Sequence, residues 1–247
     1  MRILLYSGGL DSYIISKLEP IDKALYFDLN LPYNKVEIKN MEKLDTAFYV
    51  LYPFGNGGVG GIGGFELDNK IIPLRNLFFA LYASYYGNDV ILGATKGDST
   101  HDKDQPFCDM VTKLVQYIYD PPEKAPLSCR ENKFKLSIPY REYTKTQMVK
   151  MYLAKGLSPD MLLKTRSCYG IANKECGECR SCFRKAVALR NNNIYDARLF
   201  ETDPFSKTKE NLEYAKKVGR SEEIKDIEKS VAKPVTVKRR KRKRIKL

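Results

Sequence analysis

The sequence predicts an α/β fold built on a doubly wound, mostly parallel sheet, and three observations support this. Short apolar runs of strand length alternate with stretches of helical spacing along residues 1–160, which indicates βαβ units. The first run ends in a glycine-containing loop that leads directly into a helical pattern. After about residue 160, four closely spaced cysteines predict a small helical metal-binding subdomain.

Each expected element rests on its own run of residues. Strand-length apolar runs bounded by polar segments lie at Met1–Tyr6, 24–29, 47–52 and 89–93. Helical spacing is found at 12–18, 76–86, 106–118, 144–155 and 182–190. Residues 55–64 hold seven glycines in ten positions, and we expect them to be mobile unless something binds them.

Length and hydropathy set the broad class of protein. With 247 residues, of which 43% are hydrophobic, the chain can bury the core of one large domain, or of one domain with an appendage. Its first residues form too short an apolar run for a signal peptide, and no stretch approaches the roughly 20 apolar residues of a membrane span. We therefore expect a protein of the cytoplasm, or of the host cytoplasm if the source is viral.

The net charge of +13 belongs mainly to the carboxyl end. Residues 233–247 carry nine Lys or Arg and no acid, which leaves about +4 for the other 232 residues. We expect a disordered tail that can bind nucleic acid non-specifically or contact an acidic partner, and a localisation signal or a solvated extension remain alternatives. The chain has a single histidine, His101, and no nucleophile motif points to it, so hydrolases of the Ser-His-Asp or Cys-His type are disfavoured.

A phosphate-binding loop is predicted directly behind the first strand. Glycines let the backbone approach an anion, and the N–H groups at the start of the following helix favour a phosphate. An ordinary strand-to-helix turn is the alternative. No Lys follows the glycines as in a Walker A loop, and the spacing is not that of a Rossmann fingerprint. The loop resembles the PP-loop of enzymes that cleave ATP between its α and β phosphates. Its residues are Ser7, Gly8, Gly9, Leu10, Asp11 and Ser12.

The four clustered cysteines predict a structural zinc site. Their spacing suits tetrahedral Zn²⁺, and four thiolates leave no open position for catalysis. Gly177 permits a tight turn, and we expect a helix to start at Cys182. An iron–sulfur cluster, a redox-active pair or buried thiols are the alternatives, and contact between this segment and nucleic acid through Arg166, Arg180 and Arg184 is a further one. The predicted ligands are Cys168, Cys176, Cys179 and Cys182.

Together, the PP-loop and the segment from Ser167 to Ala186 strongly resemble the 7-cyano-7-deazaguanine (preQ0) synthase family. The resemblance covers roughly residues 2–190, and further matching positions are Asp28, Pro73-x-Arg75-Asn76, Gly93, Asp98, Asp104 and Thr144-Lys145. It implies a small-molecule substrate, 7-carboxy-7-deazaguanine, which is adenylated by ATP, converted to an amide by ammonia, and then activated again and dehydrated to a nitrile. It also implies an adenine-nucleotide α-hydrolase-like fold, Mg²⁺ with the nucleotide, Zn²⁺ and a homodimer.

The resemblance also implies roles for individual residues and boundaries for the parts of the chain. The loop residues would hold the ATP phosphates, Arg75 and Asn76 would line the active site, and Lys145 would offset charge as pyrophosphate departs. Asp98 and Asp104 would be acids near the substrate or Mg²⁺. We expect a PP-loop ATP pyrophosphatase domain at 1–160, a zinc-binding subdomain at 161–205, a charged helical extension at 206–232 and the basic tail at 233–247.

One stretch departs from the family pattern and keeps other functions open. Around Asp104 the family carries an Arg and a Glu that are missing from residues 101–109 here, so an enzyme that stops at the amide or uses another acceptor is an alternative. RNA thiolation would need a reactive thiol, for which only Cys108 and Cys129 are spare. A zinc-containing nucleic-acid-binding protein without catalysis is the non-enzyme alternative.

Overall fold

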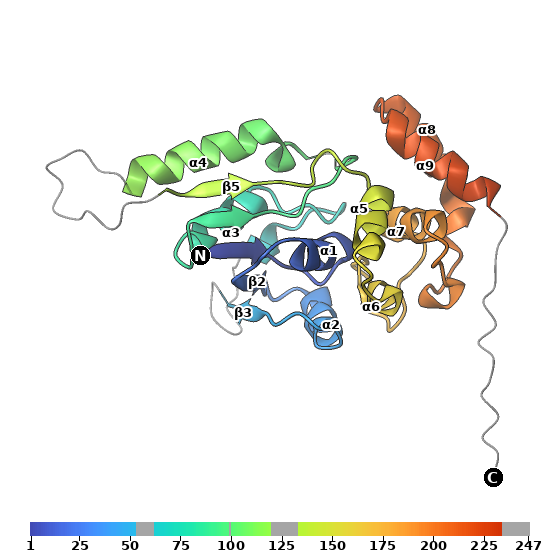
Figure 1. The fold of residues 1–247 in the computed structure, drawn as a ribbon, viewed down its shortest axis with the longest axis horizontal. Helices are drawn as coiled ribbons and strands as arrows, with labels where there is room; N and C mark the ends of the chain where they lie inside the picture. Colours follow the sequence, from blue (N-terminus) through green and yellow to red (C-terminus); the bar gives the residue numbers. More distant parts are fainter. Residues whose placement is uncertain (53–61, 99, 120–132, 234–247) are drawn as a thin grey trace, which may run out of the picture.

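A computed structural model of the chain describes residues 1–52, 62–98, 100–119 and 133–233. Its centre is a five-stranded sheet in which every pairing is parallel, with the strand order β3-β2-β1-β4-β5. Figure 1 shows the sheet with helices around it and the carboxyl-terminal helices gathered at one end. The strands are β1 (Arg2–Leu5), β2 (Lys23–Phe27), β3 (Tyr49–Leu51), β4 (Asp89–Ile91) and β5 (Lys135–Ser137). The predicted α/β class is confirmed.

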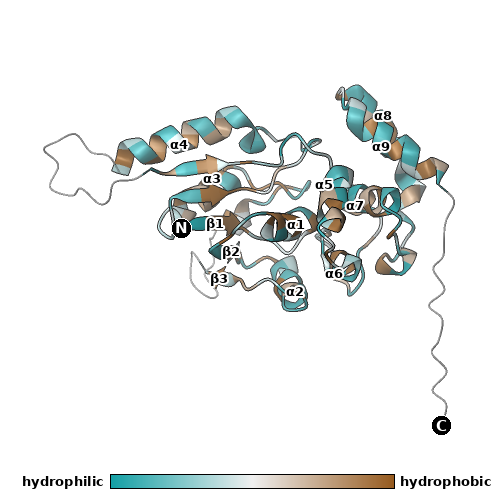
Figure 2. Cartoon of the chain, viewed as in Figure 1, coloured by the Kyte–Doolittle hydropathy of each residue, from teal (hydrophilic) through white to brown (hydrophobic). Residues whose placement is uncertain are grey.

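Alternating side chains of the strands feed two separate cores, one on each face of the sheet. On β1, Ile3 and Leu5 enter one core, whereas Leu4 and Tyr6 enter the other. Apart from a charged residue at the start of four strands and Ser137 at the end of β5, the strands are apolar, as expected for a parallel sheet covered on both faces, and Figure 2 shows hydrophobic stretches along the sheet. Burial of each large apolar side chain contributes about 1.5–3 kcal/mol.

Helices cover both faces, so the sheet is doubly wound. The first core is closed mainly by α1 (Leu10–Leu18) and α5 (Lys145–Ala154), which contribute Tyr13, Ile14, Met148 and Tyr152. The second core is closed by α3 (Arg75–Ala83) and α4 (Gln105–Tyr119), which contribute Ala80, Ala83, Val111 and Val115. After β3 the chain crosses back past β2 and β1 to form β4, so the direction of winding reverses between the neighbouring strands β1 and β4, and their ends form the switch point at which such folds bind ligands.

The remaining helices lie at the edges and at the carboxyl-terminal end. They are α2 (Pro32–Met41), α6 (Pro159–Lys164), α7 (Arg180–Asn191), α8 (Thr208–Lys217) and α9 (Ser221–Ala232), with short 3-10 turns at Ile62–Phe65, His101–Lys103, Ala197–Leu199 and Pro204–Lys207. The last two helices form a hairpin that packs on α7 through Phe183, Val187, Ala215 and Ile227. No helix in these ranges combines the length and the apolar character needed to cross a membrane.

Among the helices and strands, α2, α6 and β5 were not predicted, and α2 and β5 lack the expected pattern for a physical reason. The inward face of α2 carries polar groups, Asn34 and Glu37, because it borders a cavity rather than a core. The strand β5 has only three residues and one fully buried side chain, Leu136. Of the glycine-rich segment, residues 55–61 lie outside the described part of the chain, whereas Gly63 is buried in a 3-10 turn against the Leu29 carbonyl. The tail beyond Lys233 is also outside it.

Candidate active site and metal centre

The loop after β1 has the geometry of an anion-binding turn. Gly8 has a φ of +64°, and a Cβ at this position would lie 2.3 Å from the Met41 side chain, so only glycine fits. Gly9 is the N-cap of α1 and provides no side-chain hydrogen bond to the first turn of the helix. Apart from the Leu10 N–H, which the Ser167 hydroxyl accepts, the N–H groups of that turn therefore remain available to a phosphate. This favours the phosphate-binding interpretation over an ordinary turn.

The two serines brace this loop rather than cap the helix. The Ser12 hydroxyl accepts the Ser7 backbone N–H at 3.2 Å and donates to the Gly9 carbonyl at 3.3 Å. A segment distant in the sequence also contacts the loop: the Arg166 N–H donates to the Gly8 carbonyl at 3.1 Å, and the Ser167 hydroxyl accepts the Leu10 N–H at 3.4 Å. The loop is thus held between its own helix and residues 166–167.

The loop opens into a cavity of about 300 Å³, a size typical of small-molecule sites. Most of the predicted site residues line it together: Ser7, Gly9, Leu10, Asp11, Ser12, Arg75, Asn76, Asp98 and Lys145. Gly8, the remaining loop residue, is not among the lining residues. The cavity also contains Arg166, Arg184 and Lys103, so five cationic side chains face three carboxylates, those of Asp11, Glu37 and Asp98. This excess of positive charge suits a polyphosphate.

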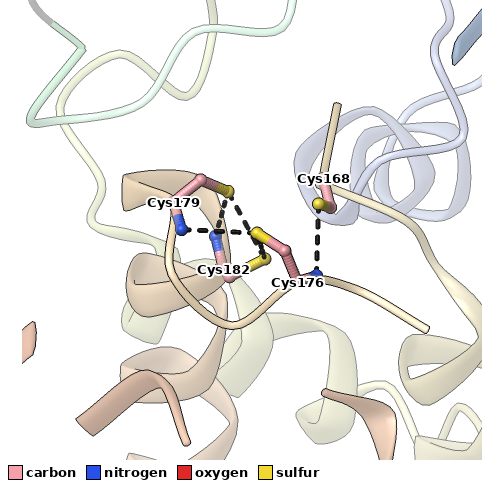
Figure 3. Close-up of side chains that lie close together, drawn as sticks. All are labelled: Cys168, Cys176, Cys179 and Cys182. Carbon is pink, nitrogen blue, oxygen red and sulfur yellow. Dashed lines mark hydrogen bonds between the residues drawn. The ribbon is translucent and has the colours of Figure 1, made fainter. Parts of the chain in front are cut away.

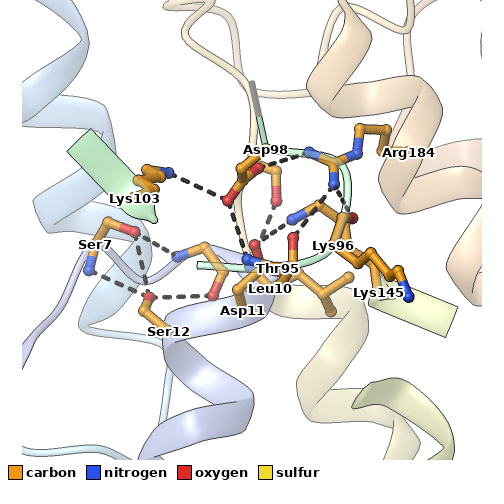
Figure 4. A network of polar contacts seen from close by, with 12 residues as sticks. Ser7, Leu10, Asp11, Ser12, Thr95, Lys96, Asp98, Lys103, Lys145 and Arg184 are labelled. Carbon is orange, nitrogen blue, oxygen red and sulfur yellow. Dashed lines mark hydrogen bonds and ion pairs between the residues drawn. The ribbon is translucent and has the colours of Figure 1, made fainter. Parts of the chain in front are cut away.

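Asp98 is the centre of a buried ion network in the cavity wall (Figure 4). Its Oδ1 accepts from Arg184 at 2.8 Å, and its Oδ2 accepts from the Thr95 N–H at 3.1 Å and lies 3.4 Å from the Lys103 Nζ. Burial by itself would raise the pKa of Asp98, but the positive charges of Lys103, Arg184 and Lys145 outweigh it and hold the pKa well below its usual range. The carboxylate is therefore ionised and fully engaged, and it orients two cations toward the cavity.

Lys145 and Asp11 form the second ion pair of the site. Lys145 is the first residue of α5 and is positioned by a capping box in which the Thr144 hydroxyl accepts the Gln147 N–H. Its Nζ contacts Asp11 Oδ2. Burial lowers the pKa of Lys145, an effect that the Asp11 charge opposes. The other oxygen, Asp11 Oδ1, is buried and has no partner among the described residues, so this carboxylate fits a Mg²⁺ ligand.

Asn76 and Arg75 begin α3 on the opposite wall. The Asn76 amide donates to Asp102 Oδ2 at 2.8 Å, which ties α3 to the 3-10 turn that carries Lys103. Arg75 lines the cavity, and its guanidinium makes no hydrogen bond or ion pair with the described part of the chain. Its guanidinium is therefore available to a ligand.

Asp104 was predicted as an acid near the substrate, and the structure places it outside this cavity. Its Oδ1 accepts the Phe107 N–H at 2.9 Å, and its Oδ2 lies 3.3 Å from the His101 ring. Asp104 thus caps α4, a helix whose first residues would otherwise lack hydrogen-bond partners. The neighbouring Lys103 lines the cavity instead and was not predicted, because a lone lysine in a polar stretch carries no pattern.

The three arginines considered for contact with nucleic acid are engaged within the fold. The Arg166 guanidinium is buried and donates to the Ala172 and Asn173 carbonyls. Arg184 is paired with Asp98, and Arg180 stacks over the Tyr214 ring at 3.8 Å. These arginines therefore contribute to the cavity and to the packing of α8. Their spacing in the sequence alone could not show whether they are engaged in this way or form an exposed basic patch.

The four predicted cysteines converge as a metal site would require (Figure 3). All four sulfur atoms lie within 4.8 Å of one another, and the pairs from Cys182 to Cys179 and Cys176 are 3.4 and 3.8 Å apart. Zn–S bonds of about 2.3 Å in a tetrahedron place sulfurs about 3.8 Å apart, so the set fits one Zn²⁺. Backbone N–H groups donate to three of the sulfurs, those of Cys168, Cys176 and Cys179, as is usual for thiolate ligands.

The local backbone explains why this segment forms such a site. Gly177 has a φ of +79°, and a Cβ there would lie 2.0 Å from the Thr202 carbonyl oxygen, so the turn after Cys176 requires glycine. The helix α7 starts at Arg180, two residues before the predicted start, and its N-cap is Cys179, whose sulfur accepts the Cys182 N–H. The predicted metal ligand Cys179 thus caps the helix in place of the usual Ser or Asp. The sequence preferences for N-caps do not include Cys, so the helix start was predicted two residues too late.

The metal centre and the cavity share one wall. Residues 165–169 run from the phosphate loop into the first ligand, Cys168, and the Ser167 N–H donates to Glu175 Oε2 at 3.1 Å. The Nζ of Lys185 is fully buried and contacts both Glu175 and the Thr165 carbonyl. This buried pair connects α7, the metal-binding loop and the cavity wall.

Cys108, one of the two thiols that RNA thiolation could use, lies away from the cavity. Cys108 is fully buried in the second core on α4, and burial raises its pKa to about 12, so it is an unreactive thiol away from the cavity. Cys129 lies outside the described residues.

Known proteins of one family are similar to this chain. The family model described as queuosine biosynthesis protein QueC matches residues 61–193, which include the cavity residues from Arg75 onward and all four cysteines. A 7-cyano-7-deazaguanine synthase of Sulfolobus acidocaldarius is 29% identical over 149 residues, which is 57% of this chain but only 29% of that protein. The proteins of that name from Colwellia psychrerythraea (synthase 2) and Persephonella marina are 26% and 25% identical over 78% of this chain and 95% and 94% of their own lengths.

Since the family model covers residues 61–193 of 247, more than half of the sequence, its match is decisive, although the chain spans less than a third of the archaeal relative. The chain belongs to the queuosine biosynthesis protein QueC family.

Proposed function

We propose that this protein is an ATP-dependent ligase that converts 7-carboxy-7-deazaguanine and ammonia to 7-cyano-7-deazaguanine. The observation that carries the proposal is the joining, in one cavity, of an uncapped glycine loop with five cationic side chains. Such a site suits a triphosphate and a carboxylate at the same time. The names of the relatives, which are 7-cyano-7-deazaguanine synthases, supply the class of the base.

The chemistry is an activation that is carried out twice. A carboxylate oxygen of the base attacks the α phosphorus of ATP, the bond to the β-phosphate oxygen breaks, and pyrophosphate leaves. Ammonia then attacks the acyl carbon, AMP leaves with the former carboxylate oxygen, and an amide remains. The amide oxygen attacks a second ATP in the same way. The nitrogen then loses its protons, and AMP leaves with the oxygen to give the nitrile.

The residues of the cavity divide this work between binding and charge stabilisation. The first-turn N–H groups of α1 and the Ser7 hydroxyl would hold the phosphates. Lys145 and Arg184 would offset the charge that develops as pyrophosphate leaves, and Asp98 would fix the position of Arg184 and Lys103. Mg²⁺ would reach Asp11 Oδ1, where it supplies charge neutralisation to the phosphates. Zn²⁺ would be structural, since four thiolates occupy its tetrahedron.

The test is incubation of the purified protein with ATP, Mg²⁺, ammonium and 7-carboxy-7-deazaguanine, followed by mass spectrometry of base and nucleotide. We expect the nitrile together with two AMP for each base converted. Absence of AMP with this base would contradict the proposal. The same experiment decides the product, because an enzyme that stops at the amide would give one AMP per base. Asp104 is turned away from the cavity and Lys103 enters it, so the altered 101–109 stretch still supplies a charged group to the site.

The family resemblance leads us to propose a homodimer as well, and light scattering coupled to size-exclusion chromatography measures it. A purely nucleic-acid-binding function is disfavoured by the inward placement of the arginines near the cysteines. The basic tail remains the candidate for such binding.

A further inference from the structure

A carboxylate that no sequence motif pointed to lies in the same cavity as the phosphate loop. Glu37 is on α2, and its Oε2 accepts a hydrogen bond from the Tyr26 hydroxyl at 2.6 Å. The Tyr26 oxygen in turn accepts from the Asn34 amide at 2.6 Å. All three residues line the cavity. This relay fixes the orientation of the carboxyl group from β2 and α2, before any ligand arrives.

The second oxygen of this carboxyl group is left for a ligand. Among the described residues, the Tyr26 hydroxyl is the donor at hydrogen-bond distance from this carboxylate, and the Asn34 amide lies close enough to lower its pKa, while no cation forms an ion pair with it. Burial raises the pKa of Glu37 to about 7, although the Tyr26 hydrogen bond and the charges of Arg75 and Arg166 oppose the shift. A carboxylate that is desolvated without a full set of donors is costly to the protein. Such a group is typical of a site in which the ligand completes the hydrogen bonding.

The hydrogen-bonding edges of the two bases in the proposed reaction differ in what they offer to a carboxylate. A guanine-type base presents, in order, the O6 acceptor, the N1–H donor and the 2-amino donor. Adenine presents one amino donor next to the N1 acceptor. An ionised carboxylate only accepts, so its two oxygens match the adjacent N1–H and 2-amino donors. Against adenine, one of its oxygens would face a lone pair.

The cation next to Glu37 completes the same pattern. Arg75 is close enough to lower the pKa of Glu37, and its guanidinium donates to no group in the described ranges. A guanidinium is a donor only and therefore matches O6. The Tyr33 and Tyr169 rings, whose centroids are 5.2 Å apart, add flat apolar surface to the same part of the lining. A donor beside an acceptor-only group is the complement of a guanine-type edge.

We propose that Glu37 determines the specificity for the base by accepting hydrogen bonds from the N1–H and 2-amino groups of the deazaguanine. This inference rests on the proposed function, since it assigns one substrate of that reaction to one end of the cavity. The adenine of ATP would then bind in another part of the cavity, from which its phosphates still extend to the phosphate loop.

A two-by-two experiment tests the assignment. The proteins are the wild type and Glu37→Gln, which keeps the size of the side chain and an acceptor for Tyr26 but replaces one acceptor by a donor. The substrates are 7-carboxy-7-deazaguanine and its analogue without the 2-amino group. Glu42→Gln is the matched control, because Glu42 is exposed at the end of the same helix. Pyrophosphate release gives KM for the base and for ATP, and thermal melting verifies folding.

We expect the KM for the natural base to rise about 10²-fold in Glu37→Gln, because buried polar groups that lose their partners discriminate strongly. The KM for ATP stays within about twofold. Removal of the 2-amino group should weaken the wild type by roughly tenfold or more, and Glu37→Gln by much less, because the partner is already lost. Glu42→Gln should behave as the wild type.

Three results would overturn the inference. A rise in the KM for ATP alone would place adenine at Glu37. Unchanged KM values for both substrates would make Glu37 a structural group. Equal use of both bases by the wild type would exclude recognition of the 2-amino group, even if the variant failed to fold. If the wild type released no pyrophosphate with either base, the proposed function itself would fail, which is a distinct outcome.

Discussion

At the scale of single residues, the site combines ion pairs within the protein with charged groups that have no ion-pair partner among the described residues. Asp98 engages Arg184 and Lys103, and Asp11 engages Lys145. The ligand-directed groups are those left over: Asp11 Oδ1, the Arg75 guanidinium and Glu37 Oε1. A site for a polyphosphate and a carboxylated base requires both the paired and the unpaired groups. The unpaired groups bind the ligands, and the paired charges lower the reaction barrier because they stay fixed when the substrate binds.

The Lys145 ammonium is the charge whose removal tests this arrangement most directly. Lys145→Met keeps the stem of the side chain but leaves Asp11 as an unpaired carboxylate beside the phosphates. We expect the rate of pyrophosphate release to fall by about 10²- to 10³-fold. Lys150→Met, on the exposed side of the same helix, is the control and should retain full activity. If Lys145→Met lost less than about threefold, the proposed role of this charge would be wrong.

The pKa of Glu37 gives the base-binding step a pH dependence of defined sign. Because the pKa is raised to about 7, the group is largely protonated in the ligand-free protein below that pH and cannot accept two donors. The groups that face it are Tyr26, Asn34, Arg75 and Arg166. We expect the KM for the base to fall as pH rises from 6 to 8, with a limiting slope of tenfold per unit below the pKa.

Steady-state kinetics at fixed, saturating ATP measures this profile. The KM for the base in Glu37→Gln should be flat over the same range, because the amide does not titrate. A wild-type profile that is equally flat would contradict the assignment.

Much of the site was accessible from the sequence, and what was missed has a common cause. The phosphate loop and the cysteine ligands are local patterns, so spacing alone identified residues that the structure brings together. Glu37, Lys103 and Arg184 reach the cavity from three distant segments, and only the packing of α2, α7 and the 101–103 turn brings them there. Asp104 was assigned by its position in a family motif, whereas its side chain caps α4.

At the scale of elements, the segment 165–169 connects two sites that the sequence presented as separate. One side of it hydrogen-bonds the phosphate loop through Arg166 and Ser167. Its other side leads into Cys168 and is fixed by Glu175. The metal centre therefore helps to define the cavity wall, although it lies outside the cavity. The polar inner face of α2 shows the same principle, because elements that border a site lose the amphipathic pattern by which helices are recognised.

The buried pair of Lys185 and Glu175 is the point at which this connection can be broken. Lys185→Met leaves the Glu175 carboxylate buried without its cation, which typically costs about 3–5 kcal/mol of stability. We expect a lower free energy of unfolding in urea, weaker retention of zinc on dialysis and a higher KM for ATP. Elemental mass spectrometry measures the metal independently of activity.

The matched control is Lys174→Met, an exposed lysine next to Glu175 in the same loop. It removes the same charge from the loop but breaks no buried contact, so its stability and metal content should equal those of the wild type. Stability lost in Lys185→Met with an unchanged KM for ATP would show that the pair supports the fold without positioning the cavity wall.

At the scale of the whole molecule, the carboxyl-terminal hairpin is joined to the site by charge. Glu223 on α9 lies 3.6 Å from Arg184, the same arginine that Asp98 holds in the cavity, and Glu222 pairs with Lys96 at 2.9 Å. The last described residue, Lys233, is itself anchored, since its Nζ donates to the Asn191 carbonyl at 2.7 Å and its own carbonyl accepts from Arg190 at 2.6 Å. The hairpin is thus secured on α7 up to Lys233.

This anchoring defines where the chain can be cut to separate the tail from the chemistry. A variant that ends at Lys233 keeps every contact of α9 but removes residues 234–247, which contain eight Lys or Arg. We expect pyrophosphate release and melting temperature to be unchanged. Binding to duplex DNA should weaken, and its dependence on salt should decrease, because each lost phosphate contact removes about 0.9 from the slope of log K against log salt.

Fluorescence anisotropy with a labelled duplex at several salt concentrations measures the binding, and a full-length variant with the eight basic residues replaced by Gln controls for chain length. Both variants should lose the same affinity, since the expected attraction depends on charge rather than on sequence. Retained affinity in both would mean that the folded part binds DNA, whereas loss of pyrophosphate release in the truncated protein alone would mean that the tail contributes to the active site. With activity intact and affinity lost, the tail would be a separable electrostatic arm on a complete enzyme.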